Sequence, residues 1–301
     1  MISSVLMLLL AGQIGQPLSA GDGTRHVLVD GKPRSYLVHV PPQYDATQPT
    51  PVVLVLHGLG INAAIMVPFS GMNDKSDEAG FIAVYPNGSG IGPFRTFNAG
   101  GRSGPMAHRA ADDVQFVSLL LDDLSGVANV DAKRVFATGI SNGGMLCYRL
   151  AAELSERIAA IAPVAGAMAI EQAHPSRPVS VLHFHGTADK IVPYTGPNRT
   201  TPPFLTFLSV EESIAVWRRI NECPEVPTLT QWNDSHPDGT SVEQLVYGPG
   251  REGTEVILVK ICGGGHTWPG KDSLVGRLGR SSLEISANDL IWEFFQKHPI
   301  P

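Results

Sequence analysis

The stretch TGISNGG, residues 138–144, places a single serine, Ser141, among glycines. It directly follows the apolar run 135–137 and directly precedes a helix-like segment, 145–154. Residues 139–143 fit the G-x-S-x-G pattern, in which a sharp strand-to-helix turn lifts a serine hydroxyl clear of a sheet. A serine hydroxyl is a weak nucleophile near neutral pH. This chemistry therefore needs a histidine base and a carboxylate that orients the base.

Two later segments supply an acid and a base at the ends of predicted strands. Asp189 lies in HGTADKIVP, just after the strand 179–185, and His266 lies in GGGHTWPG, just after the last strand. Serine, then acid, then histidine is the chain order on an α/β-hydrolase sheet. We therefore predict Ser141 as the nucleophile, Asp189 as the acid and His266 as the base.

The other histidines and acids have less suitable positions. His183 and His185 precede the acid and lie within a strand, where a histidine is more often structural. Asp112 and Asp113 head a predicted helix, where a carboxylate favours the positive end of the helix dipole. We expect helix capping from these two residues.

A tetrahedral intermediate also needs hydrogen-bond donors that point at its oxyanion. In this fold one donor is the backbone N–H of the residue after the nucleophile, here Asn142, and another comes from the loop after an early strand. LHGLG, residues 56–60, is that loop, and we predict the N–H of Leu59 as the second donor. Trp268 and His57 are weaker predictions for the substrate pocket. The alternatives are a buried structural tryptophan and a histidine that only ends a strand.

The sequence predicts neither a metal nor a cofactor. The histidines at positions 57, 183, 185 and 266 form neither H-E-x-x-H nor a tight Cys/His pair. The glycines of CGGGH, residues 262–266, do not lead into a phosphate-binding P-loop, and no G-x-G-x-x-G opens a helix after the first strand.

Strands and helices alternate along the chain after an antiparallel start. Asp30-Gly31 predicts a hairpin within 26–41, and continuous apolar runs predict buried strands. Together they predict a doubly wound, mostly parallel sheet with antiparallel N-terminal strands. We expect strands at 51–58, 81–87, 135–140, 158–166, 179–186 and 255–261, helices at 66–79, 111–124, 145–154, 210–221 and 286–298, and irregular cleft rims at 101–109 and 193–204.

Composition favours one globular catalytic domain, residues 21–301. The chain has 301 residues, is 43% hydrophobic and has a net charge of −6 without a run of lysine or arginine, so nucleic acid is not an expected partner. Residues 1–20 resemble a secretory signal, although they lack the usual positive start; an unstructured start is the alternative. The apolar run 5–11 is too short to span a bilayer. We expect a secreted or periplasmic protein with no membrane span.

The chain contains three cysteines, at positions 147, 223 and 262, and so has at most one disulfide. A bond between Cys223 and Cys262 is one alternative. We expect Cys147, on the helix after the serine, to be a small core residue.

These motifs, including LHGLGIN, FNAGG, NVDAKRVFATGISNGGMLCYRLAAEL, HGTADKIVPY and GGGHTWPG, resemble the polyhydroxybutyrate depolymerase and feruloyl esterase group of α/β-hydrolases, similar to carbohydrate esterase family 1. The resemblance runs from about Val27 to Ile300. It implies secreted serine esterases that work without a cofactor on polyester or plant cell-wall esters. The resemblance also implies Ser141 as the nucleophile, Asp189 as the acid and His266 as the base, the same roles that the motifs predict.

Departures from the family pattern narrow these expectations. Members often carry a cysteine after the NAGG stretch and another before the last strand; here those places read Arg102-Ser103 and YGPGREG, 247–253. The family partner of Cys223 corresponds to Gly250. Leu59 stands where polymer depolymerases often have a cysteine, and no aromatic-rich or Thr-rich binding domain is appended, which favours a small or soluble ester.

Several functions are compatible with these residues. The expected substrate is a small or oligomeric ester, linked to polysaccharide or polyester, with feruloyl, hydroxyalkanoate and acetylxylan esters as candidates. The alternatives are a depolymerase acting on the polymer, a non-catalytic binding protein on a hydrolase scaffold, and a peptidase of the same fold.

Overall fold

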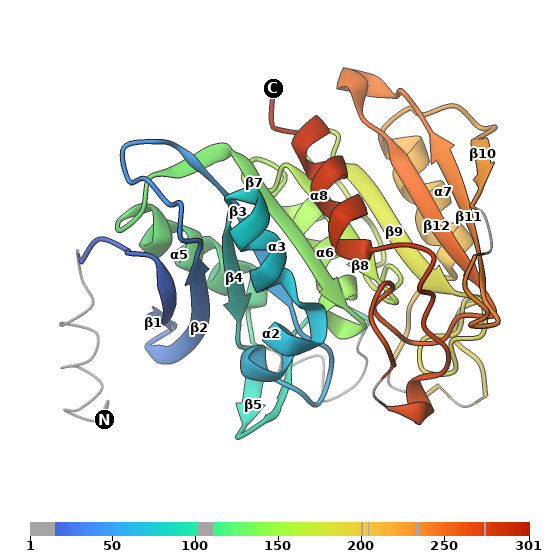
Figure 1. Ribbon diagram of the computed structural model, residues 1–301, viewed down its shortest axis with the longest axis horizontal. Coiled ribbons are helices and arrows are strands. Elements are labelled where there is room, and N and C mark those ends of the chain that lie inside the picture. Colours follow the sequence, from blue (N-terminus) through green and yellow to red (C-terminus); the bar gives the residue numbers. More distant parts are fainter. Residues whose placement is uncertain (1–15, 102–110, 200, 204, 233–234, 274) are drawn as a thin grey trace.

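A single ten-stranded sheet forms the centre of the protein (Figure 1). The computed structural model describes residues 16–101, 111–199, 201–203, 205–232, 235–273 and 275–301. In spatial order the strands are β1 (Gly21–Val29), β2 (Lys32–Val40), β4 (Ile82–Pro86), β3 (Thr50–Leu56), β7 (Val130–Ile140), β8 (Ala160–Val164), β9 (Ser180–Gly186), β12 (Val256–Cys262), β11 (Ser241–Tyr247) and β10 (Thr228–Gln231).

The direction of the strands changes from the centre of the sheet to its edges. The six central strands, from β4 to β12 in spatial order, are parallel to one another, whereas β1 and β2 on one side and β11 and β10 on the other are joined by antiparallel pairing. The first hairpin turns at Asp30 (φ 48°) and Gly31 (φ 71°), two left-handed residues that match the right-handed twist of a strand pair. The predicted mostly parallel α/β-hydrolase sheet with an antiparallel start is confirmed.

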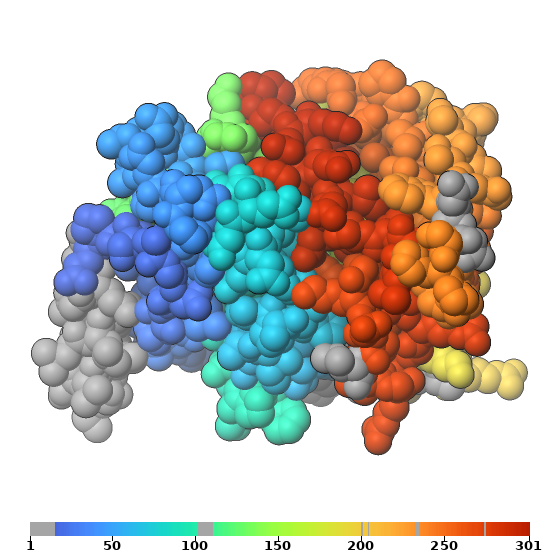
Figure 2. Space-filling view, in the orientation of Figure 1, coloured from blue at the N-terminus to red at the C-terminus, as the bar shows by residue number. Residues whose placement is uncertain are grey.

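Helices cover both faces of the sheet because its central strands are apolar on both sides. On β3, Val52 and Leu54 face the core beneath α5 (Asp113–Ser125), α6 (Asn142–Glu153) and α7 (Val210–Ile220), whereas Val53 and Val55 face the opposite core. That second core lies beneath α2 (Ala63–Ser70), α3 (Met72–Ala79) and α8 (Ala287–Lys297). Figure 2 shows this second face, where the chain around α2 and α3 and the C-terminal segment cover the sheet.

Three parts of the predicted element pattern differ from the structure. The predicted helix 66–79 is two helices, because Gly71 (φ 64°) ends α2 in the left-handed conformation and α3 begins directly after it. The strands β11 and β10 extend the sheet beyond the predicted last strand. A small hairpin, β5 (Ser89–Ile91) with β6 (Phe94–Thr96), was also not predicted.

The cysteines do not pair with one another. Cys147, Cys223 and Cys262 are all free, so the considered Cys223–Cys262 bond is wrong. Cys147 is fully buried in the core, as expected. Cys223 instead lies against Gly250, where a built Cβ atom would be 2.6 Å from its Sγ.

Two predicted segments are described only in part. Most of the predicted signal, residues 1–20, and of the predicted rim 101–109 lies outside the described residues. Within the residues that are described, no helix combines the length and apolarity needed to cross a bilayer.

Candidate active site

Ser141 occupies a strained turn at the carboxyl end of β7. Its backbone has φ 58° and ψ −121°, a conformation that residues with a side chain rarely adopt, and α6 begins at the next residue. The Ser141 N–H donates to the Val164 carbonyl at 2.9 Å, which ties the turn to the neighbouring strand. This is the local geometry that the G-x-S-x-G pattern predicts.

The glycines around Ser141 allow backbone segments to approach one another closely. A Cβ at Gly143 would be 2.3 Å from the Leu56 carbonyl oxygen, and one at Gly139 would be 2.6 Å from the same atom. A Cβ at Gly166 would be 2.3 Å from the Ser141 carbonyl oxygen. No side chain fits at these distances. The glycines therefore let α6 pack directly on the ends of β3 and β8.

Asp189 and His266 form a buried hydrogen-bonded pair. The His266 Nδ1–H donates to Asp189 Oδ2 at 2.7 Å, and both side chains are almost completely buried. The other carboxylate oxygen, Oδ1, accepts from the N–H groups of Ile191 and Val192 at 2.8 and 2.9 Å. Burial alone would raise the pKa of Asp189, but the hydrogen bond and charge of His266 outweigh it and lower the pKa. Asp189 is thus held as a carboxylate.

Ser141 and His266 both line one apolar cavity of about 550 Å³. The predicted oxyanion residues Leu59 and Asn142 line it too, so four of the predicted site residues meet there. Asp189 lies behind His266, outside the lining. The remaining lining residues are Gly58, Ile61, Ile65, Phe69, Thr96, Ile140, Met145, Ile191, Val192, Leu205, Val275 and Leu278.

His57 does not line the cavity, which corrects its weaker prediction as a pocket residue. Its ring is fully buried. Nδ1 bonds to the Gly58 carbonyl at 2.8 Å, and Nε2 accepts from the Gly88 N–H at 2.9 Å. Burial lowers the pKa of His57 to about 4, so the ring is neutral near pH 7. Its polar atoms therefore fasten the 57–60 loop to the segment after β4.

Trp268 does not line the cavity either, and its prediction as a pocket residue is also corrected. Only 2% of its surface is exposed, and its indole N–H donates to the Asn288 side chain of α8 at 2.8 Å. The tryptophan packs in the core beneath α8, because the chain turns into the protein after His266.

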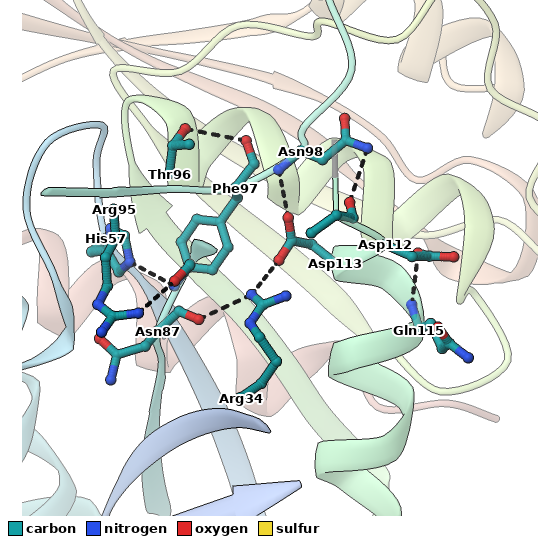
Figure 3. A network of polar contacts seen from close by, with 12 residues as sticks. Arg34, His57, Asn87, Arg95, Thr96, Phe97, Asn98, Asp112, Asp113 and Gln115 are labelled. Atoms are coloured by element: carbon teal, nitrogen blue, oxygen red, sulfur yellow. Dashed lines mark hydrogen bonds and ion pairs between the residues drawn. The ribbon is translucent and has the colours of Figure 1, made fainter. Parts of the chain in front are cut away.

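A polar network, shown in part in Figure 3, holds residues 96–98 in place. Asn142 Oδ1 accepts from the Phe97 N–H at 2.7 Å, while its amide donates to the Phe97 carbonyl at 3.1 Å. Figure 3 shows Asp113 between Arg34 and Asn98; it pairs with Arg34 at 2.5 Å and accepts from the Asn98 N–H at 2.6 Å. Asp112 caps α5 as predicted, by accepting from the Gln115 N–H. Asp113 thus orders the cavity wall instead of capping.

Several cavity residues were not predicted. Ile65 and Phe69 belong to α2, Thr96 to β6, and Val275 and Leu278 to the irregular segment before α8. These elements meet only through tertiary packing. Leu205 also lines the cavity and lies one residue past the predicted rim 193–204, so the sequence prediction placed this part of the wall almost correctly.

No metal site accompanies this arrangement in the described part of the chain, where no group of three or more histidine, cysteine, aspartate or glutamate side chains is placed to hold an ion.

The protein is similar in fold and in sequence to known esterases. An acetyl xylan esterase from Aspergillus awamori superposes with a TM-score of 0.61 over 91% of this chain and 99% of that structure, at 15% sequence identity. "Putative esterase NocK" of Nocardia uniformis subsp. tsuyamanensis is 34% identical over 287 residues, which cover 90% of this chain and 81% of that protein.

Feruloyl esterase B of Piromyces equi is 32% identical over 163 residues, 52% of this chain and 29% of that protein. The bifunctional acetylxylan esterase/xylanase XynS20E of Neocallimastix patriciarum is 28% identical over 232 residues, and the match covers 31% of it. The chain thus matches under a third of the length of either protein. These matches confirm the resemblance to esterases of the feruloyl type.

The sequence profile of the phospholipase/carboxylesterase family (Abhydrolase_2) matches residues 43–216, a span that begins before β3 and includes the serine turn and the Asp189 turn. With the sheet order and the full-length relative, this match places the chain: it belongs to the phospholipase/carboxylesterase family and is an esterase of the α/β-hydrolase type.

Proposed function

We propose that this protein hydrolyses carboxylic esters through Ser141, His266 and Asp189 by way of an acyl-enzyme. The observation that carries the proposal is the buried His266–Asp189 hydrogen bond of 2.7 Å beside the cavity that Ser141 lines from its strained turn. A neutral histidine whose Nδ1–H is held by a carboxylate presents the lone pair of Nε2, as a general base requires.

Each step of the reaction has a residue for its proton. Ser141 Oγ attacks the ester carbonyl while His266 Nε2 takes the hydroxyl proton, and His266 returns that proton to the departing alkoxide. A water then attacks the acyl-enzyme, again losing its proton to His266, and the carboxylic acid leaves as Ser141 recovers its hydrogen. Asp189 stabilises the imidazolium at both stages and stays ionised.

The Leu59 N–H is the proposed second oxyanion donor, and His57 orients it. In a planar trans peptide the C=O and N–H groups point in opposite directions. Because the Gly58 carbonyl points to the buried His57 ring, the N–H of the same peptide, which belongs to Leu59, points the other way. The Asn142 N–H lies at the start of α6, where the helix dipole also favours negative charge.

The cavity favours an apolar acyl group larger than acetyl. Among the described residues, the lining is mainly aliphatic, with one phenyl ring and no ionisable side chain besides His266, and the volume lies in the range of sites for drug-sized ligands. A feruloyl-type aromatic acyl group is our first candidate. A short hydroxyalkanoate chain is the second, favoured by the aliphatic side chains. We further propose, from the character of residues 1–20 alone, that the protein is exported.

The test is a rate survey of the purified protein against methyl ferulate, p-nitrophenyl acetate and butyrate, a hydroxybutyrate trimer and acetylated xylan. Ser141→Ala is expected to abolish turnover. Ser125→Ala, at the solvent-facing end of α5, is the matched control and is expected to keep it.

The outcomes separate the alternatives. A burst of nitrophenol equal to the protein concentration supports the acyl-enzyme, and preference for ferulate or for the trimer selects the substrate class. Acetylated xylan as the best substrate would contradict the assignment of a large acyl group. An absence of any turnover would favour the non-catalytic scaffold, and cleavage of a chromogenic peptide alone would favour the peptidase.

A further inference from the structure

Two histidines that the proposed reaction does not use lie completely buried behind Asp189. His183 and His185 project from the same face of β9, with their rings parallel and 5.2 Å apart. His183 Nε2 is 3.0 Å from His185 Nδ1. The Tyr148 hydroxyl of α6 is 2.7 Å from His183 Nδ1, and His185 Nε2 is 2.8 Å from the Val192 carbonyl oxygen. The four groups form one continuous chain of hydrogen bonds.

If both histidines are neutral, the hydrogen bonds of this network can donate in only one direction, from Tyr148 toward Val192. A carbonyl oxygen only accepts, so His185 must carry its hydrogen on Nε2 and accept at Nδ1. His183 must then donate from Nε2 and accept at Nδ1 from the Tyr148 hydroxyl. Burial lowers the pKa of both histidines, to which their mutual proximity contributes for His183, so the neutral forms are the relevant ones. Every nitrogen in the chain is then satisfied.

This hydrogen-bond network ends at the turn that holds Asp189, the proposed catalytic acid. Val192 accepts from His185 through its carbonyl, and its N–H donates to Asp189 Oδ1. The same residue lines the cavity. His185 Nε2 also lies 3.5 Å from Asp189 Oδ2, the oxygen that His266 binds. A positively charged His185 would compete with His266 for that oxygen, whereas a neutral His185 committed to Val192 does not.

We propose that Tyr148, His183 and His185 are positioning residues: they hold the Asp189–Val192 turn from inside the protein so that Asp189 Oδ2 stays aimed at His266. The proposal rests on the proposed function for its kinetic consequence, but the tautomers and the hydrogen bonds can be tested without turnover.

The direct test is ¹⁵N NMR of the full-length protein with labelled histidines. Near pH 7, His183 and His185 are expected to be neutral, protonated at Nε2 and unprotonated at Nδ1, because burial lowers the pKa of both. Tyr148→Phe is expected to shift the Nδ1 resonance of His183 without changing its tautomer. An Nδ1–H tautomer or an imidazolium at either position would overturn the proposal, whatever the enzyme's activity.

The kinetic test compares two replacements of one residue. His185→Leu removes the donor to Val192, whereas the amide of His185→Gln can still donate to that carbonyl. We expect His185→Leu to lower kcat per titrated active site about 10²-fold, with little change in KM, because a displacement of about 1 Å in a positioned group has this effect. His185→Gln is expected to recover most of the loss.

His298→Leu is the matched control. His298 is another buried histidine with two side-chain partners, Ser180 and Glu255, but it lies at the C-terminal end of α8. We expect lower stability and an unchanged kcat.

The remaining outcomes are also decisive. A folded His185→Leu with wild-type kcat, or a His185→Gln no better than it, would overturn the proposal. If His185→Leu does not fold, Tyr148→Phe takes its place, with an expected loss of at least about threefold in kcat. A wild-type protein without a nitrophenol burst would refute the proposed function, while the NMR result still decides the positioning role.

Discussion

The turn that holds Ser141 and the turn that holds Asp189 lie at the same edge of the sheet, after β7 and β9, yet different interactions fix them. The Ser141 turn depends on the absence of side chains at Gly139, Gly143 and Gly166, which brings backbone atoms close together. The Asp189 turn also has a close backbone contact, because a Cβ at Gly186 would be 2.3 Å from the Gly264 carbonyl oxygen, but it depends in addition on side-chain hydrogen bonds, from His266 on one side and His185 on the other.

This difference implies different weaknesses. Backbone packing has no titrating group of its own, so acid should affect the Ser141 turn indirectly, through the neighbouring His57 loop, whereas added volume should disrupt the turn itself. Hydrogen bonds through neutral histidines break when the rings gain a proton, so the Asp189 turn is expected to tolerate neither acid nor loss of a partner.

Gly143→Ala should have the largest effect. Its Cβ would be 2.3 Å from the Leu56 carbonyl oxygen, a backbone atom that cannot move without shifting β3. We expect a loss of roughly 3 kcal/mol of unfolding free energy. Displacement of the neighbouring Asn142 N–H should also lower kcat about 10²-fold or more.

Urea unfolding and ester kinetics check the Gly143 prediction. Gly23→Ala, where the nearest atom is a Val38 methyl group at 3.4 Å, an ordinary van der Waals distance, is the control and should behave like wild type. Equal stability of the two variants would mean that close backbone packing does not define the Ser141 turn.

Acid should destabilise the protein through its buried neutral histidines. His57, in the loop next to the Ser141 turn, has a pKa of about 4 in the folded protein against 6.5 when free, so below about pH 6.5 the unfolded state binds more protons. Stability should therefore fall as pH falls from about 6.5 to 4, by about 3 kcal/mol from this one group. The depressed pKa values of His183 and His185 act in the same direction.

Urea titrations and amide exchange at pH 7 and at about pH 4.5 test this acid sensitivity. The Ile191 and Val192 amides of the Asp189 turn should lose protection before the Met145 amide, which bonds to Ser141 in the first turn of α6. A uniform loss of protection across both turns would remove the distinction. A flat stability curve would contradict the buried neutral histidines.

Asn142→Ala probes the side-chain hydrogen bonds between the Ser141 turn and residues 96–97. It removes the acceptor of the Phe97 N–H and the donor to the Phe97 carbonyl. We expect a loss of about 2 kcal/mol, because a partly buried N–H loses its partner. Asn142→Asp keeps the acceptor and should lose less. If thermal unfolding shows the alanine variant to be as stable as wild type, the other bonds of this segment, among them those of Asn98 to Asp113 and Arg149, are sufficient to hold it.

Ser141→Gly should have the smallest effect on stability and the opposite sign. Glycine adopts φ 58° and ψ −121° without strain, so we expect a gain of about 1 kcal/mol together with complete loss of turnover. Ser141→Ala should lose turnover without that gain. Equal unfolding midpoints for the two variants would show that the turn stores no strain.

The same contrast explains what could be predicted from the sequence. The Ser141 turn is local: its glycines, the preceding β-strand and the following helix are consecutive, so Ser141 and Asn142 could be assigned to one motif. The Asp189 turn draws its support from Tyr148 on α6 and His266 after β12, and no spacing rule connects these residues to His183 and His185. Core and ligating histidines look alike in a sequence until their partners are known.

Burial decided the two wrong pocket assignments in the same way. Trp268 and His57 are close in sequence to cavity residues, but their own side chains turn inward to Asn288 and to Gly58 and Gly88. The break at Gly71 was missed because a glycine inside an apolar helical pattern is tolerated as often as it ends the helix.

Cys223 and Gly250 have a consequence for how related sequences can diverge. The thiol occupies the space that a side chain at position 250 would need, and the Asn221 carbonyl oxygen would be 2.3 Å from that Cβ. The two positions are therefore expected to covary: a side chain at 250 requires a small shift of the 221–223 backbone and, in addition, either a smaller residue at 223 or a cysteine at 250 that bonds to Cys223. Among relatives, glycine at 250 with cysteine at 223 and cysteine at both should be frequent, and valine or leucine beside an unpaired cysteine should be rare.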